Sequence, residues 1–242
     1  MSRLRNNIIV ITGGANGIGK AVAELLSIDN YIYILDTDDS NVKYFDSINI
    51  FFKKCDISSY AEVDKVVYEI YSERQHIDIL VNNASKQMIS DFSHYNDKDY
   101  LYIMKNNYIG TCNCISAVTK YVQSNLFILN VLSIHSNVPR TNKYAYDSSK
   151  SALEILTKEL ALEFAPRNIT INAISFGAVE TDMNASWNYN KEEKKVALAK
   201  VPLKKIFLPD EIAVFIKTIL EVFSRYTTGS IFVVDGGRSL MN

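Results

Sequence analysis

The sequence predicts an α/β fold, a doubly wound Rossmann-like three-layer sandwich with a seven-stranded parallel sheet. Short apolar, β-branched runs alternate along the chain with stretches of helical spacing. Several of these runs are uninterrupted, which is typical of parallel strands covered on both faces. The 242 residues are 48% hydrophobic and 22% charged, which fits one domain over 1–242 with a well-buried core.

The expected elements alternate in order, and each strand ends near a polar or small residue. The strands are expected at 8–12, 31–35, 50–52, 77–81, 126–132, 169–174 and 230–234. The helices are expected at 21–26, 60–71, 97–124, 144–164 and 210–223. A polar interval around Trp187 interrupts this alternation, and we interpret about 182–207 as a substrate lid.

Composition excludes several classes of protein. The formal net charge is -1 and the basic residues are scattered, so we expect neither nucleic acid nor membrane as a partner. No apolar run reaches the length of a signal-peptide core or a membrane span. Cys55, Cys112 and Cys114 lack paired metal-ligand spacing, so we expect no metal and reduced thiols in a cytoplasmic protein.

A glycine cluster follows the first expected strand, with Gly13, Gly17 and Gly19 leading into a helix. Such a loop allows backbone N–H groups and the helix dipole to meet a pyrophosphate. Asp36 ends the second strand, where a carboxylate accepts hydrogen bonds from an adenosine ribose and repels a 2′-phosphate. The pattern therefore favours NAD over NADP.

The segment 144–153 places Tyr146 four residues before Lys150, so a helix presents both side chains on one face. A phenol has a reference pKa of about 10, and a nearby cation favours its ionised form. Such a pair could move a proton to or from an alcohol oxygen.

In this order the motifs resemble the short-chain dehydrogenase/reductase family, over nearly the whole chain. The matching segments are 12–19, Asp56-Ile57, 82–84, Asn107, Ser133, Thr181 and 235–237. Ser133 lies thirteen residues before Tyr146, the spacing at which the family places its catalytic serine. The resemblance implies that NAD contacts Gly13, Asn16, Gly17, Ile18, Gly19, Asp36, Asp56, Ile57, Asn83, Tyr146, Lys150, Val179 and Thr181.

The resemblance also implies four catalytic roles. Tyr146 would be the general acid/base, while Lys150 would lower its pKa and hold the nicotinamide ribose. Ser133 would hydrogen-bond the substrate oxygen, and Asn107 would anchor a water that connects Lys150 to solvent. Hydride would pass between the nicotinamide and the substrate carbon.

Three residues depart from the family pattern: Phe176 replaces a proline, Ser85 replaces a glycine, and Asp147 follows the catalytic tyrosine. Phe176 restores an N–H group and loosens φ, so the loop beneath the nicotinamide could sit differently. A carboxylate beside Tyr146 would oppose phenolate formation, and we expect Asp147 to point outward.

The substrate residues are similar to those of the D-3-hydroxybutyrate dehydrogenase branch of the family. In that branch the residues matching Gln87, His135 and Lys143 hold the substrate carboxylate, which suits three hydrogen-bond donors. Trp187 corresponds to a further lid residue, a glutamine in that branch. A histidine two residues after the serine also occurs in the family's sugar dehydrogenases.

We therefore expect an NAD-dependent oxidoreductase for a small polar secondary alcohol or its ketone, with a 3-hydroxy acid ahead of a sugar or polyol. The alternatives are a 3-oxoacyl carrier-protein reductase and an NAD-binding regulator that has lost turnover. Family members are commonly tetramers, so the resemblance implies a homotetramer, with a homodimer as the alternative. The subunits would pair through the helices at 113–125 and 148–164.

Overall fold

The computed structural model describes residues 4–45, 47–181, 190–224 and 226–241. At its centre lies a seven-stranded sheet with the order β3-β2-β1-β4-β5-β6-β7, and every neighbouring pair is parallel. The predicted fold class is confirmed, and no strand end moves by more than two residues. The strands are β1 (Ile8–Thr12), β2 (Tyr31–Asp36), β3 (Ile50–Lys54), β4 (Ile79–Asn82), β5 (Phe127–Ser133), β6 (Thr170–Phe176) and β7 (Ile231–Val234).

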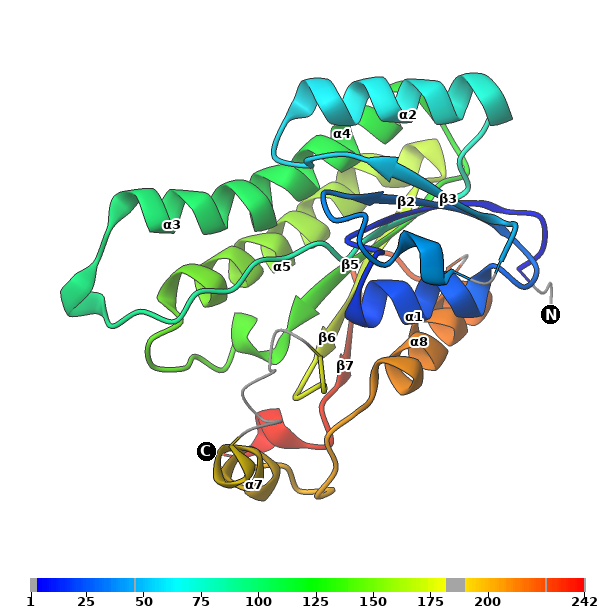
Figure 1. Cartoon of the computed structure of the whole chain (residues 1–242). Helices are drawn as coiled ribbons and strands as arrows, with labels where there is room; N and C mark the ends of the chain where they lie inside the picture. Colours follow the sequence, from blue (N-terminus) through cyan, green and yellow to red (C-terminus); the bar gives the residue numbers. More distant parts are fainter. Residues whose placement is uncertain (1–3, 46, 182–189, 225, 242) are drawn as a thin grey trace.

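Helices cover both faces of the sheet (Figure 1). One face packs against α2 (Tyr60–Arg74), α4 (Gly110–Tyr121) and α5 (Tyr144–Phe164). The other face packs against α1 (Gly17–Leu26) and α8 (Pro209–Thr218). Each interface is a continuous apolar cluster, so the sheet is buried on both sides as its uninterrupted strands predict.

The expected long helix at 97–124 is divided. It consists of α3 (Asp97–Met104), a π-helical segment η3 (Lys105–Ile109) and α4, and it ends at Tyr121 because Val122 is extended. The wider π turn lies where Asn107 is fully buried. Such segments are frequent at functional sites.

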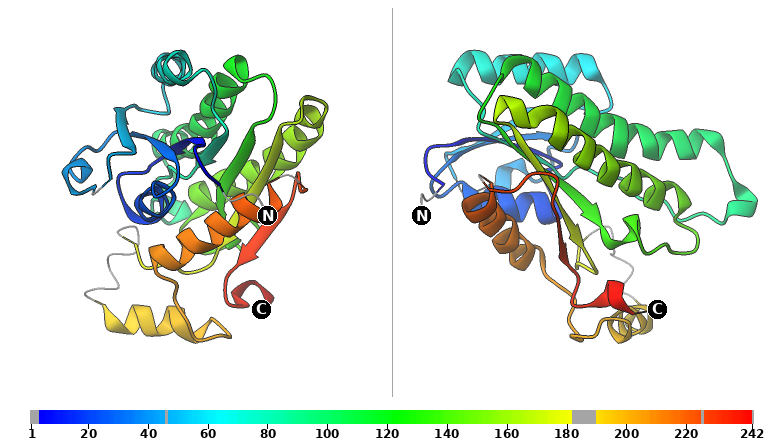
Figure 2. Two further views of the ribbon diagram at one scale, coloured as in Figure 1. Left: turned by 90° about the vertical axis from the view of Figure 1, so that its right-hand side faces the viewer. Right: turned by 180° about the vertical axis from the view of Figure 1, so that it is seen from behind.

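Shorter elements complete the fold. They are η1 (Val42–Tyr44), η2 (Phe92–His94), η4 (Ile134–Ser136), η5 (Ala165–Arg167), α7 (Lys191–Ala199), η7 (Ile219–Phe223) and η8 (Arg238–Leu240). Figures 1 and 2 show α7 beside η8, beyond the carboxyl ends of β6 and β7. Helix α7 falls within the expected lid, which stays a prediction, and Trp187 lies outside the described residues. No described helix is long and apolar enough to cross a membrane.

The strand order reverses between β1 and β4, which are neighbours at the sheet centre. The chain leaves β1 toward α1 on one face and leaves β4 toward α3 and α4 on the other (Figure 1). In open parallel sheets this arrangement opens a crevice beyond the carboxyl ends of the strands, where ligands bind.

Gly19 holds the β1–α1 loop against the sheet. A Cβ atom there would lie 2.2 Å from the carbonyl oxygen of Gly13 and 2.6 Å from Nδ2 of Asn83. We expect Gly19→Ala to lower the free energy of unfolding by about 1–3 kcal/mol, because the loop must shift to admit the methyl group. Urea unfolding would measure this loss.

The control is Lys20→Ala at the next position, which removes a partly exposed ion pair with Glu24 and a contact of the ammonium group with the Phe45 ring at 5.9 Å. That change should cost about 0.5 kcal/mol or less. Equal urea midpoints for Gly19→Ala and the wild type would show that the loop is not packed as described.

Candidate functional site

A cavity of about 610 Å³ opens at the carboxyl edge of the sheet. Most residues singled out by the sequence line it: Gly13, Asn16, Gly17, Ile18, Asp36, Asp56, Ile57, Asn83, Gln87, Ser133, His135, Lys143, Tyr146, Lys150, Val179 and Thr181. Gly19 and Asn107 instead support the walls from behind, and Trp187 lies outside the described residues. The predicted residues therefore converge on one space, although they are spread over most of the chain.

The glycine loop presents the N-terminus of α1 to this cavity. The first backbone bond of the turn runs from Lys20 N–H to the Asn16 carbonyl at 3.1 Å. The preceding N–H groups have no acceptor within the helix, and Asn16 makes no side-chain cap. Asn83 Nδ2 donates to the Gly13 carbonyl oxygen at 2.8 Å and fixes the loop. The free donors and the helix dipole suit a pyrophosphate.

Carboxylates gather at the end of the cavity beside β2. Asp36 Oδ2 accepts from Ala15 N–H at 3.0 Å, and its Oδ1 accepts from Asp38 N–H at 3.1 Å. Asp38 Oδ2 accepts from Asn16 Nδ2 at 3.2 Å, and hydrogen bonds from Ser40 lower the pKa of Asp38. Each carboxylate oxygen can accept a second hydrogen bond, so this end suits the hydroxyl groups of a ribose.

Helix α5 brings Tyr146 and Lys150 beneath the cavity. Lys150 is 2% exposed and its Nζ donates to the Val131 carbonyl oxygen at 2.8 Å. The same Nζ lies 5.6 Å from the centre of the Tyr146 ring. Burial lowers the pKa of Lys150 to about 8, so most of the population remains charged at neutral pH.

The pKa of Tyr146 departs from expectation. Burial of the phenol raises its pKa to about 12, and this outweighs the lowering by the Arg140 charge and by a hydrogen bond with Ser133. The expected lowered pKa is wrong for the free protein, because desolvation dominates and Lys150 directs its ammonium group at a backbone carbonyl. The free protein therefore holds Tyr146 as a neutral phenol.

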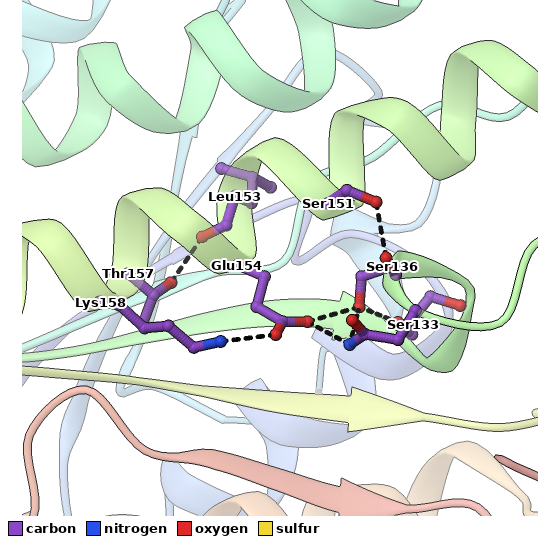
Figure 3. Close-up of polar contacts among 8 residues, drawn as sticks. Ser133, Ser136, Ser151, Leu153, Glu154, Thr157 and Lys158 are labelled. Atoms are coloured by element: carbon purple, nitrogen blue, oxygen red, sulfur yellow. Dashed lines mark hydrogen bonds and ion pairs between the residues drawn. The ribbon is translucent and has the colours of Figure 1, made fainter.

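Ser133 ends β5, and a polar network ties the turn after it to α5 (Figure 3). Ser136 Oγ lies 2.8 Å from the Ser133 carbonyl oxygen and 2.9 Å from Glu154 Oε2, and shares its proton between them. Ser151 Oγ donates to the Ser136 carbonyl oxygen at 2.7 Å, and Lys158 Nζ donates to Glu154 Oε1 at 2.8 Å. Helical spacing from Tyr146 could have identified Glu154, which the sequence reasoning missed.

Asn107 holds two segments together. Its Oδ1 accepts from Lys86 N–H at 2.7 Å. Its Nδ2 donates to the Lys86 carbonyl oxygen at 2.9 Å and to Ser149 Oγ at 3.0 Å. The side chain thus clamps the chain after β4 to α5, and the water path from Lys150 stays a prediction.

Asp147 does not point outward as expected. It is 7% exposed, and its Oδ2 accepts from the backbone N–H of Arg140 at 2.9 Å. The first turn of α5 faces the loop 137–143, which covers the carboxylate. Burial raises the pKa of Asp147, and its charge acts against phenolate formation at Tyr146.

The wall beyond Tyr146 is basic. Besides Lys143, it includes Arg140 and Arg238, which sequence reasoning missed and whose charges act on His135. Gln87 and the acidic Glu193 line the same cavity. His135 differs from the expected carboxylate donor, because its Nδ1 lies 2.6 Å from the Val138 carbonyl oxygen and donates to it. Burial lowers the pKa of His135 to about 4, so the ring is neutral and its Nε2 is an acceptor.

Comparisons with known proteins agree with this geometry. The model of a family described as enoyl-(acyl carrier protein) reductase matches residues 13–239. A 3-oxoacyl-(acyl-carrier-protein) reductase of Thermotoga maritima is 30% identical over 247 residues, which cover 97% of this chain and 98% of the relative. Glucose 1-dehydrogenase 2 of Bacillus subtilis is 24% identical over 249 residues, with 98% and 96% covered.

Solved structures extend the similarity. A short chain dehydrogenase family protein from Francisella tularensis has a TM-score of 0.87 at 26% identity, covering 98% of this chain and 100% of that one. The Pseudomonas aeruginosa RhlG/NADP active-site complex shares the fold, with a TM-score of 0.90, 23% identity and 98% of each chain covered. The chain therefore belongs to the short-chain dehydrogenase/reductase family and is an enzyme of that type.

Proposed function

We propose that this enzyme interconverts a small polar secondary alcohol and its ketone, with NAD as the hydride carrier. The observation that carries the proposal is the position of Tyr146 beside Ser133. Both line one cavity, which is also lined by the glycine loop before α1 and by the cations Arg140, Lys143 and Arg238. A dinucleotide and a polar substrate can therefore meet at the phenol.

The residues of the chain divide the chemistry among them. A bound nicotinamide supplies or accepts the hydride. Ser133 Oγ and Tyr146 Oη hold the substrate oxygen, and Tyr146 donates a proton to it during reduction. Lys150 holds the nicotinamide ribose, while Asn107 keeps Ser149 and the chain after β4 in place around it.

The preference for NAD rests on the carboxylates of Asp36 and Asp38. Both are placed to accept hydrogen bonds from ribose hydroxyls, and both would repel a 2′-phosphate. One solved relative is an NADP complex, and the exposed Lys86 also lines this end of the cavity. The two carboxylates outweigh this one cation.

A 3-hydroxy acid such as 3-hydroxybutyrate is the first substrate class that we propose, because Gln87 and Lys143 line the same cavity as Tyr146. Relatives named as a glucose dehydrogenase and a 3-oxoacyl reductase support a sugar or an acyl thioester equally well. An NAD-binding regulator is the alternative without catalysis. Screening hydroxy acids, polyols and acyl thioesters by NADH absorbance separates these classes.

The pKa of Tyr146 determines how rate depends on pH. Oxidation needs the phenolate, so its kcat/KM should rise by about tenfold per pH unit between about pH 6 and 8. Reduction uses the phenol that is already present, so its kcat/KM should change little over that range. Stopped-flow or steady-state absorbance of NADH measures both directions.

Tyr146→Phe should lower kcat by about 10²–10⁴-fold while NADH still binds. The control is Tyr144→Phe, because the Tyr144 hydroxyl is buried, has no hydrogen-bond partner among the described residues and does not line the cavity. Turnover that survives in Tyr146→Phe would exclude the phenol as the proton donor.

Cofactor choice should follow the charge of Asp36. The wild type should use NADH in preference to NADPH, and Asp36→Asn should lower the NADH/NADPH ratio of kcat/KM by roughly tenfold or more, because it removes a repulsive charge but keeps an acceptor oxygen. Asp99→Asn on the exposed side of α3 makes the same charge change as a control. A wild-type preference for NADPH would contradict the assignment.

A further inference from the structure

The loop between η4 and α5 supplies two cations to the cavity wall beyond Tyr146. Arg140 and Lys143 both line the cavity. Within the described parts of the chain, neither the Arg140 guanidinium nor the Lys143 ammonium forms a hydrogen bond or an ion pair, and Arg140 Nε is buried without a partner. Asp147 acts on both cations, and Glu193 on Lys143, through charge without a hydrogen bond to either side chain, and Asp147 Oδ1 is likewise buried without a partner.

Asp147 explains why Arg140 lies there. Its buried carboxylate accepts the Arg140 backbone N–H at 2.9 Å and so attaches the loop to the first turn of α5. The guanidinium itself remains unbound. Arg140 is half-buried and its buried Nε has no acceptor, which is costly, so this site is organised for an anion that arrives with a ligand.

The cofactor pyrophosphate does not fill this role. Figures 1 and 2 show the loop between η4 and α5 on the opposite side of the carboxyl edge from the start of α1, where the phosphate-binding loop lies. The two cations lie six and three residues before Tyr146 and line the same cavity, so we assign their anion to the substrate.

His135 places a second requirement on the chemistry of the substrate. Its Nδ1–H is donated to the Val138 carbonyl oxygen, and burial, together with the charges of Arg140, Lys143 and Arg238, lowers the pKa of the ring so that it is neutral. Nε2 can therefore act only as a hydrogen-bond acceptor, and a carboxylate cannot donate to it. A hydroxyl group can.

We propose that the substrate is a polyhydroxylated anion, whose acidic group binds Arg140 and Lys143 and whose second hydroxyl donates to His135 Nε2. This rests on the proposed function and narrows its substrate class to anions with further hydroxyl groups, so that 3-hydroxybutyrate itself becomes a poor substrate. A neutral polyol would leave two cations unpaired, and 3-hydroxybutyrate would leave His135 without a donor. The acidic group is a carboxylate or a phosphate ester, since both accept bidentate hydrogen bonds from arginine.

The test compares matched compounds with the wild-type enzyme and NAD. They are D-gluconate and L-galactonate as polyhydroxylated carboxylates, glucose 6-phosphate as a phosphate, sorbitol as a neutral polyol and D-3-hydroxybutyrate as an acid with one hydroxyl. KM for the preferred polyhydroxylated anion should be about tenfold or more below the KM values of sorbitol and 3-hydroxybutyrate. Whether a carboxylate or the phosphate is preferred identifies the acidic group.

Substitutions test which side chains bind the acidic group and the second hydroxyl group of the substrate. Arg140→Met should raise the ratio of KM for the preferred anion to KM for sorbitol by about 10- to 100-fold. His135→Phe should raise KM for that anion more than KM for 3-hydroxybutyrate. Lys98→Met removes an exposed positive charge on α3, outside the cavity, and should leave these ratios unchanged.

Calorimetric titration of each compound into the protein–NADH complex distinguishes failure of the proposed oxidoreductase function from failure of the anion-site proposal. Absence of turnover together with anion binding that Arg140→Met abolishes would overturn the proposed function and support the anion site. Equal affinity for sorbitol and the anions, or no binding of any anion, would overturn the anion site whether or not turnover occurs.

Discussion

The hydrogen bond from Lys150 Nζ to the Val131 carbonyl oxygen sets the position of helix α5 on strand β5. A buried ammonium group must find an acceptor, so α5 cannot slide along β5 without a large energetic penalty. Tyr146 precedes Lys150 by one helical turn, and Ser133 follows Val131 by two residues on the strand. One buried contact therefore brings the phenol and the serine hydroxyl together. Burial of the Lys150 ammonium group disfavours its charged form, which is why its pKa is lowered.

Much of the fold follows from local patterns in the sequence. Uninterrupted apolar runs such as Ile8–Thr12 identify strands buried on both faces, and the glycines after that strand identify the loop. The meeting of residues far apart in the chain follows from the parallel topology, because all carboxyl ends lie at one edge. For this reason the cavity is lined by nearly every residue that the motifs singled out.

The sequence could not predict features that depend on tertiary contacts. The π turn around Asn107 arises where the helix must present that amide to Lys86 and Ser149. The burial of Asp147 depends on how the loop before α5 folds back. The tautomer of His135 depends on a single carbonyl oxygen three residues away, and this determines whether the ring donates or accepts.

The charges around Tyr146 also link substrate binding to proton transfer. In the free protein the positive charge of Arg140 lowers the pKa of the phenol, while Asp147 and burial raise it. An anion bound to Arg140 would cancel much of that positive field, so the phenol would hold its proton more firmly. The positive charge of an oxidised nicotinamide would act in the opposite direction. Because the ketone and the alcohol would both carry this anion, its effect on the phenol is the same in both directions. The charge of the nicotinamide is what differs between them, and the oxidised cofactor favours removal of the proton from an alcohol.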